Sequence, residues 1–278
     1  MIHRRGVLGA IVLAATGCST LPSSSRIALS GTLEQGSLAI GKLTPGATVT
    51  LDGAPLHVSP EGIFAFGFAY DQIASAALQA SFADGTQESR TITPVARRYD
   101  VQRINGLPEP LVTPPPDVQQ RIQKEHAAVA DARMRDTDGL GFAQPLDWPA
   151  AGIVSGVFGS QRILNGEPKA PHFGVDIAAP EGSSIHAPAD GIVSNSGDYY
   201  LEGGFTLIDH GHGVSTCYFH QSKRLVTEGT RVTRGDLIGL IGQTGRATGP
   251  HVHWGMNWFQ MRLDPSRSTR TPAPSPAP

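Results

Sequence analysis

Histidines in short, regular patterns concentrate the polar chemistry of the chain between residues 172 and 253. Two patterns place an aspartate four residues after a histidine, and two are H-x-H pairs. The four patterns are His172/Asp176, His186/Asp190, His210/His212 and His251/His253. Catalytic zinc sites commonly use three protein N or O ligands and leave a fourth position for water. Because each pattern is short enough to occur by chance, its surroundings must decide which could hold a metal ion.

Two of the patterns fit extended, rigid backbone. His251 and His253 lie in the sequence PHVHW, where strand alternation places both imidazoles on one face. His172 and Asp176 flank Phe-Gly-Val, and their even separation in an extended segment again places both side chains on one face. The residues therefore predict a metal site made of His172, Asp176 and either His253 or His251. The competing interpretation is a group of surface histidines on a β domain.

The other two patterns have the chemistry of turns. His210 and His212 lie in DHGHG, which is typical of a hairpin tip, and glycine on both sides of His212 makes a poor platform for a metal. His186 and Asp190 enclose a proline, and a glycine follows them. We therefore interpret Asp190 as a turn residue and His186 as a strand-edge residue.

Three segments of this region resemble the lysostaphin/LytM family of zinc peptidases. They are PHFGVDIAAP, TCYFHQS and GPHVHW, and their order and rough separation also match the family. APADGIV at 187–193 and the DHGHG hairpin at 209–213 are similar too. The likeness covers about residues 144–265. The N-terminal β region and the helical connector resemble those that precede this domain in some Gram-negative members.

The resemblance implies roles for five residues. By it, His172, Asp176 and His253 are the ligands of one Zn²⁺ per chain, and His220 and His251 are catalytic histidines beside the metal. Spacing alone assigns no role to His220, and it leaves open which of His251 and His253 binds zinc.

Three further positions bear on the surroundings of this site. Many family members carry an acidic residue two places after the second histidine of the H-x-H motif, where this chain has Gly255. That difference weakens the expected support around the site but removes no ligand. Arg162 and Asn165, in the segment QRILNGEP, are either substrate contacts or ordinary polar loop residues.

Composition favours a mainly β protein. Glycine and proline number 33 and 22 of 278 residues, which argues against a helical bundle or coiled coil. The net charge of −2 gives no sign of a nucleic-acid partner and no reason to expect a highly anionic polymer as substrate. The two cysteines, Cys18 and Cys217, cannot form a disulfide framework, and Cys217 is expected to be a small core residue.

The N-terminus has the features of a targeting signal. A basic start, a short apolar run and the small residues before Cys18 are typical of a secretory signal that ends in a lipobox-like ATGC. We expect residues 1–17 to be a signal peptide, Cys18 to carry a lipid, and 18–25 to form a tether. Ser19 after the cysteine resembles an outer-membrane sorting signal. The sequence thus predicts a periplasmic, lipid-anchored protein, more at the outer than the inner membrane.

The rest of the chain divides by pattern into a small N-terminal β-sandwich, a helical connector and a C-terminal antiparallel β-sheet metallopeptidase domain. Asp52-Gly53 and Asp84-Gly85 mark hairpins in the sandwich, and Asp117 with Gln120 has capping-box spacing at the start of the helix. The expected ranges are a β-sandwich at 26–95, a Pro-rich linker at 96–116, a connector helix at 117–137, a zinc peptidase domain at 144–266 and a disordered tail at 267–278.

These features predict a secreted zinc endopeptidase that cuts peptide cross-links of peptidoglycan, specifically D-Ala–diaminopimelate bonds. Its partners would be peptidoglycan and, through Cys18, a membrane. An alternative is a non-enzymatic LytM-like activator of other wall hydrolases, and another is a wall-binding lipoprotein that acts through its β-sandwich. The presence of all five site residues favours the enzyme over the activator.

Overall fold

The computed structural model describes residues 25–274 and is mainly β, which confirms the predicted fold class. The expected signal peptide and Cys18 lie outside the described residues. In the described part, none of the helices is both long and apolar enough to cross a bilayer.

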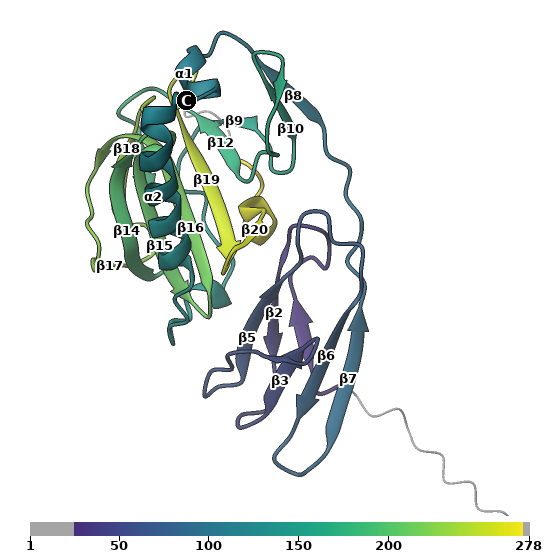
Figure 1. Ribbon diagram of the computed structural model, residues 1–278. Coiled ribbons are helices and arrows are strands. Elements are labelled where there is room, and N and C mark those ends of the chain that lie inside the picture. Colours follow the sequence, from purple (N-terminus) through teal and green to yellow (C-terminus); the bar gives the residue numbers. More distant parts are fainter. Residues whose placement is uncertain (1–24, 275–278) are drawn as a thin grey trace, which may run out of the picture.

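The N-terminal region consists of two antiparallel sheets that enclose one apolar core (Figure 1). The first sheet has the order β1 (Ala28–Ser30), β2 (Leu38–Lys42), β5 (Ile63–Gly67), and the second has the order β4 (Ala54–Pro55), β3 (Thr48–Leu51), β6 (Ala76–Ser81), β7 (Gln87–Ile92). Asp52-Gly53 joins β3 to β4, and Asp84-Gly85 joins β6 to β7, as the turn dipeptides predict. Phe64, Phe66 and Phe68 are fully buried in this core.

The segment predicted as a Pro-rich linker, residues 96–116, is not a linker throughout, because it contains one strand and one helical turn. β8 (Val101–Ile104) pairs in parallel with β10 (Gln161–Leu164), which in turn pairs with β11 (Glu167–Pro168). A helical turn, α1 (Glu109–Val112), follows. The Asn165 side-chain amide donates to the carbonyl of Leu107 and accepts from its N–H, at 2.8 and 3.2 Å. These contacts hold the segment against the C-terminal domain.

The connector helix α2 (Pro116–Arg133) begins one residue earlier than predicted, ends at Arg133 rather than at residue 137, and has no capping box. Its N-cap is Pro115, which makes no side-chain hydrogen bond. Proline in the first turn fixes a helical φ and needs no N–H partner there, so it can start the helix without a capping side chain. The apolar face meets the sheet, where Val129 and Ala132 pack against Phe205 and Cys217. The free Cys217 is buried, as predicted.

The C-terminal domain is built on one ten-stranded sheet. Its main order is β17 (Arg231–Val232), β14 (Gly191–Tyr199), β15 (Gly203–Gly211), β16 (Val214–Arg224), β19 (His251–Trp258), β12 (Val175–Ala178), β9 (Ile153–Gly156). Three further strands complete the sheet. β18 (Leu237–Ile241) pairs with β16 on one side and with β13 (Ser184–His186) on the other. β20 (Met261–Leu263) pairs with β19. The strands predicted between residues 192 and 256 are all present.

The two faces of this sheet have different environments. Val252 and Trp254 of β19 point into the main apolar core. The alternating residue His253 lies directly opposite Phe219 of β16, and Phe219 packs with the cluster beneath α2. Residues directly opposite in a ladder share a face, so His253 lies on the same side of the sheet as Phe219 and the helix that packs on it. Figure 1 shows α2 lying across this sheet.

The C-terminal segment is ordered beyond the point expected. A short 3-10 helix, η2 (Pro265–Ser268), follows β20, and another, η1 (Gly141–Ala143), precedes β9. Thr269 forms a β-bridge with Leu146, and the Arg270 guanidinium donates to Asp147. The prediction of a disordered tail from residue 267 is therefore wrong for its first residues, and 275–278 lie outside the described part.

Asp264 joins the N-terminal region to the C-terminal domain. Its carboxylate accepts from the Arg97 guanidinium at 2.9 Å and from the N–H of Ser266 at 3.0 Å, and its own N–H donates to the carbonyl of Gly36. The side chain is only 3% exposed. A buried carboxylate with these partners couples the two regions, because its removal leaves the Arg97 guanidinium without its carboxylate.

We predict that Asp264→Ala lowers the free energy of unfolding by about 3 kcal/mol, because it breaks a largely buried ion pair by removing one partner. Urea denaturation of the soluble form lacking residues 1–18 measures this. The matched control is Glu228→Ala, which removes an exposed partner of Arg135 at 2.8 Å. The control should leave the midpoint nearly unchanged. Equal shifts for both variants would show that burial at Asp264 does not matter.

Candidate metal centre

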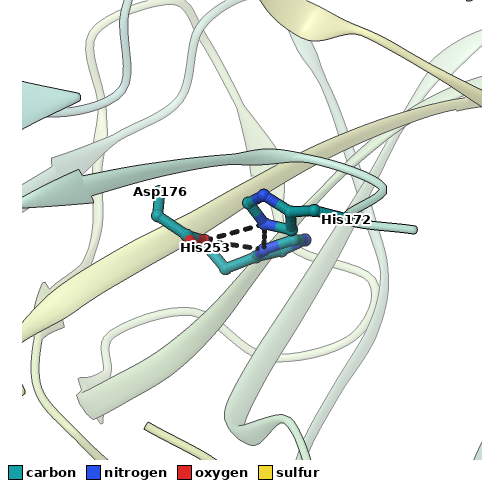
Figure 2. A group of neighbouring side chains, drawn as sticks. All are labelled: His172, Asp176 and His253. Atoms are coloured by element: carbon teal, nitrogen blue, oxygen red, sulfur yellow. Dashed lines mark hydrogen bonds and ion pairs between the residues drawn. The ribbon is translucent and has the colours of Figure 1, made fainter. Parts of the chain in front are cut away.

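Three side chains converge on one point (Figure 2). Two of them, His172 and His253, line a cavity together with residues of α2. His172 Nε2 lies 2.8 Å from His253 Nδ1, and Asp176 Oδ1 lies 3.0 Å from the first nitrogen and 2.9 Å from the second. Asp176 on β12 is directly opposite His253 on β19, and His172 lies in the loop that enters β12. Strand pairing therefore brings together residues that are 77 positions apart in the sequence.

The donor set fits a divalent metal ion. Two imidazole nitrogens and one carboxylate oxygen are the ligand types that zinc accepts, and all three residues are buried. The observed separations are only slightly shorter than the roughly 3.3 Å between two ligands of a tetrahedral zinc ion. His172 Nδ1 lies 3.2 Å from the Val157 carbonyl, a contact that leaves Nε2 for the ion. Within residues 25–274, this is the one group of its kind.

Arg162 contacts the oxygen of the Asp176 carboxylate that does not face the histidines. Its Nη2 donates to Asp176 Oδ2 at 2.7 Å, so the other oxygen, Oδ1, faces the two histidines. Burial opposes ionisation of Asp176, but hydrogen bonds and charge from His172 and His253 outweigh it and hold the pKa of that carboxyl well below its usual range. The site thus keeps an ionised ligand. Sequence reasoning offered Arg162 only as a substrate contact or a loop residue, and no local motif indicates its contact with Asp176.

His220 and His251 lie beside this cluster with their rings 4.7 Å apart. Each Nδ1 is close to a backbone carbonyl, at 2.7 Å to Thr244 for His220 and 2.8 Å to Gly249 for His251. An Nδ1–H donated to a carbonyl leaves Nε2 as the free acceptor of a neutral ring. Burial, together with the nearby His251 and His253, lowers the pKa of His220 to about 3, so this ring is neutral at pH 7. His251 Nε2 lies 3.8 Å from Asp176 Oδ1.

Glycines let neighbouring backbone segments lie close to the side chains of the cluster. A Cβ at Gly174 would lie 2.4 Å from His253 Nε2, and one at Gly156 would lie 2.5 Å from Asp176 Oδ2. Gly255 is also crowded, since a Cβ there would lie 2.7 Å from the Cys217 sulfur. The acidic residue that the resemblance led us to expect at position 255 therefore has no room in this packing.

The remaining histidine patterns lie away from the cluster, as their turn chemistry predicts. His210 is buried between the Asp190 carbonyl and the Thr216 hydroxyl, at 2.7 and 2.8 Å. His212 occupies the turn between β15 and β16 with a φ of 50°, and its ring stacks on His57. His186 Nδ1 contacts the Gly235 carbonyl. These rings serve packing and turns.

Comparison with known proteins agrees with this geometry. Residues 170–265, which include all five candidate residues, match Peptidase family M23. Two similar relatives are the peptidoglycan DD-endopeptidases ShyA and ShyC of Vibrio cholerae serotype O1, 45% identical over 85 residues and 41% identical over 112. These matches cover 31% and 40% of this chain but only 20% and 25% of the relatives, so the likeness is confined to one domain.

A solved structure extends the likeness beyond that domain. A candidate M23 peptidase from Pseudomonas aeruginosa aligns with 85% of this chain and 94% of its own, at 29% identity and a TM-score of 0.66. Coverage of 85% shows that the likeness extends beyond residues 170–265. The family match and these likenesses show that the chain carries a Peptidase family M23 domain, which confirms the resemblance drawn from its histidine motifs.

Proposed function

We propose that the protein is a zinc endopeptidase that cleaves peptide cross-links of bacterial peptidoglycan, at D-Ala–diaminopimelate bonds. The observation that carries this proposal is a buried three-ligand cluster beside two histidines whose Nε2 atoms are free. The names of the relatives ShyA and ShyC, both peptidoglycan DD-endopeptidases, support the substrate class. A D-Ala–diaminopimelate cross-link is a bond of the kind that such a name describes.

Each residue of the site then has a distinct task. His172, Asp176 and His253 would hold the ion, and Arg162 orients the carboxylate of Asp176. A bound zinc ion would polarise the scissile carbonyl and lower the pKa of a coordinated water. The backbone carbonyls that accept from Nδ1 orient His220 and His251 with Nε2 free. Because its low pKa makes His220 a poor base, His251 is the ring that can take a proton from a water. The protonated ring can then return the proton to the leaving amine.

The alternative of a non-enzymatic activator has less support. An activator needs no metal and no proton-transfer group, whereas this chain has both sets of residues and has glycine where the ligands need space.

We also propose that Cys18 carries a lipid and that the protein is periplasmic, at the outer rather than the inner membrane. The ATGC signal and the polar residues that follow it support this location.

We predict that His253→Ala loses zinc and activity together, because it removes one of three ligands. His251→Ala should keep zinc near one per chain and lose at least about a hundredfold in turnover, because only proton transfer is affected. Metal analysis after dialysis, together with turnover, measures both. His186→Ala, outside the cluster, is the control and should retain both properties. Loss of zinc from His251→Ala but not from His253→Ala would invert the assignment.

We predict that the soluble form lacking residues 1–18 converts cross-linked muropeptides to monomers, with a free D-Ala carboxyl and a free diaminopimelate amine at each cut. Mass analysis of digested peptidoglycan identifies these ends. The His251→Ala protein serves as the inactive control. Digestion that leaves dimeric muropeptides intact while it releases sugars or whole stem peptides would contradict the proposed bond.

We predict that Cys18→Ser releases the protein from membranes or blocks its maturation, because the modified thiol is lost. Fractionation of cells that express each form, with the mass of the mature protein, measures this. Ser19→Ala is the matched control and should remain in the membrane fraction. A Cys18→Ser protein that stays membrane-bound at the wild-type mature mass would refute lipidation.

A further inference from the structure

A cavity lies beside the metal centre, between the sheet and α2. This pocket of about 460 Å³ is bounded by Val129 and Ala130 of the helix, by Phe205 and Phe219 of the sheet, and by the ligand His172. The ligand His253 also lines it. A peptide bound at the metal centre could therefore extend a side group into this pocket without leaving the same face of the sheet.

The lining of this pocket carries a strong excess of positive charge. Five cationic residues contribute to it, and Glu202 is the one carboxylate among its lining residues. The cations are Arg133, Arg162, Lys169, Arg246 and Arg262. Glu202 lies 3.4 Å from the imidazole of His126 rather than within ion-pair distance of an arginine. The chain as a whole is slightly acidic, so its overall charge does not explain this excess.

In the described part of the chain, three of these cations form no ion pair, although the charge of Glu202 acts on two of them, Arg246 and Arg262. Arg162 pairs with Asp176 and Lys169 pairs with Glu167, but within residues 25–274 no ion pair forms at Arg133, Arg246 or Arg262. Arg133 is only 5% exposed, and its Nε has no hydrogen-bond partner. Burial lowers the pKa of Arg262 to about 10, with nearby Arg133 adding to the effect, and the Arg262 guanidinium stays charged at pH 7. Buried charge without a partner is costly, so an anion would be strongly favoured here.

The placement of the arginines also connects the pocket to the reaction site. Arg162 and Arg246 line both this pocket and a smaller cavity that contains His220, His251 and Asp176. The anion that enters would thus belong to the molecule whose bond lies at the metal centre. Guanidinium groups match carboxylates through paired, charge-assisted hydrogen bonds.

We propose that Arg133, Arg246 and Arg262 form an arginine pocket that binds a free carboxylate of the peptide substrate and so selects acidic over amidated peptides. This inference rests on the proposed peptidase function and specifies its substrate chemistry. A purely structural role for the arginines is the opposing explanation, since Arg133 also lies in the last turn of α2, where a cation suits the helix dipole.

The experiment compares a cross-linked muropeptide dimer with the same dimer after its carboxylates are converted to amides. For the wild type, we expect amidation to lower kcat/KM by about tenfold to a hundredfold, the usual effect of losing a charge-assisted hydrogen bond. Arg262→Gln should cleave the acidic dimer more slowly by a similar factor and lose most of the discrimination. Arg231→Gln, an exposed arginine on the edge strand β17, should behave as the wild type.

Binding to zinc-depleted protein, measured by calorimetry for the same two dimers, gives a readout that does not depend on turnover. We expect the wild type to bind the acidic dimer more tightly and Arg262→Gln to bind both alike. Equal affinities and equal cleavage of the two dimers by the wild type would overturn the arginine pocket and leave the peptidase proposal standing. Failure to cleave either dimer, with tighter binding of the acidic one, would refute the peptidase but support the pocket.

Discussion

The antiparallel pairing of β12 with β19 is the constraint on which the site depends. It sets Asp176 directly opposite His253, and the two side chains meet at 2.9 Å. A slip of one residue in this register would send one of them to the apolar face, because side chains alternate along a strand. The register is fixed by that apolar face, where Val175, Ile177 and Trp254 are almost fully buried. The core thus positions the chemistry on the opposite face.

Support for the catalytic groups comes mainly from the backbone and from one cation. The carbonyls of Val157, Thr244 and Gly249 orient three imidazoles, and Arg162 orients the carboxylate. Rings held in this way lose little conformational entropy when a substrate binds. The same arrangement requires backbone to approach closely at Gly156 and Gly174, which explains why small residues occur beside the ligands.

The sequence predicted what depends on local periodicity. Alternation placed His251 and His253 on one face, and turn chemistry excluded the DHGHG pair, both as observed. It did not predict the contact of Arg162 with Asp176 or the pairing of β8 with β10, because both depend on which segments the fold brings together. The start of α2 was misplaced because a proline in the first turn replaced the expected capping side chain. Net charge likewise gave no sign of a local cluster of arginines.

The five candidate site residues and some of the residues that line the cavities around them come from different parts of the chain. All five candidate residues fall within 170–265, the range that matches the family. The surrounding walls include Gln102 and Leu107 from the segment after the β-sandwich and Arg133 from α2, which lie outside that range. Relatives matched over only 85 to 112 residues are similar to this chain within one domain and need not share these walls. Under the proposed function, substrate side groups would meet these walls and the scissile bond would meet the cluster. Selectivity among peptides should therefore vary with the segments that precede the domain.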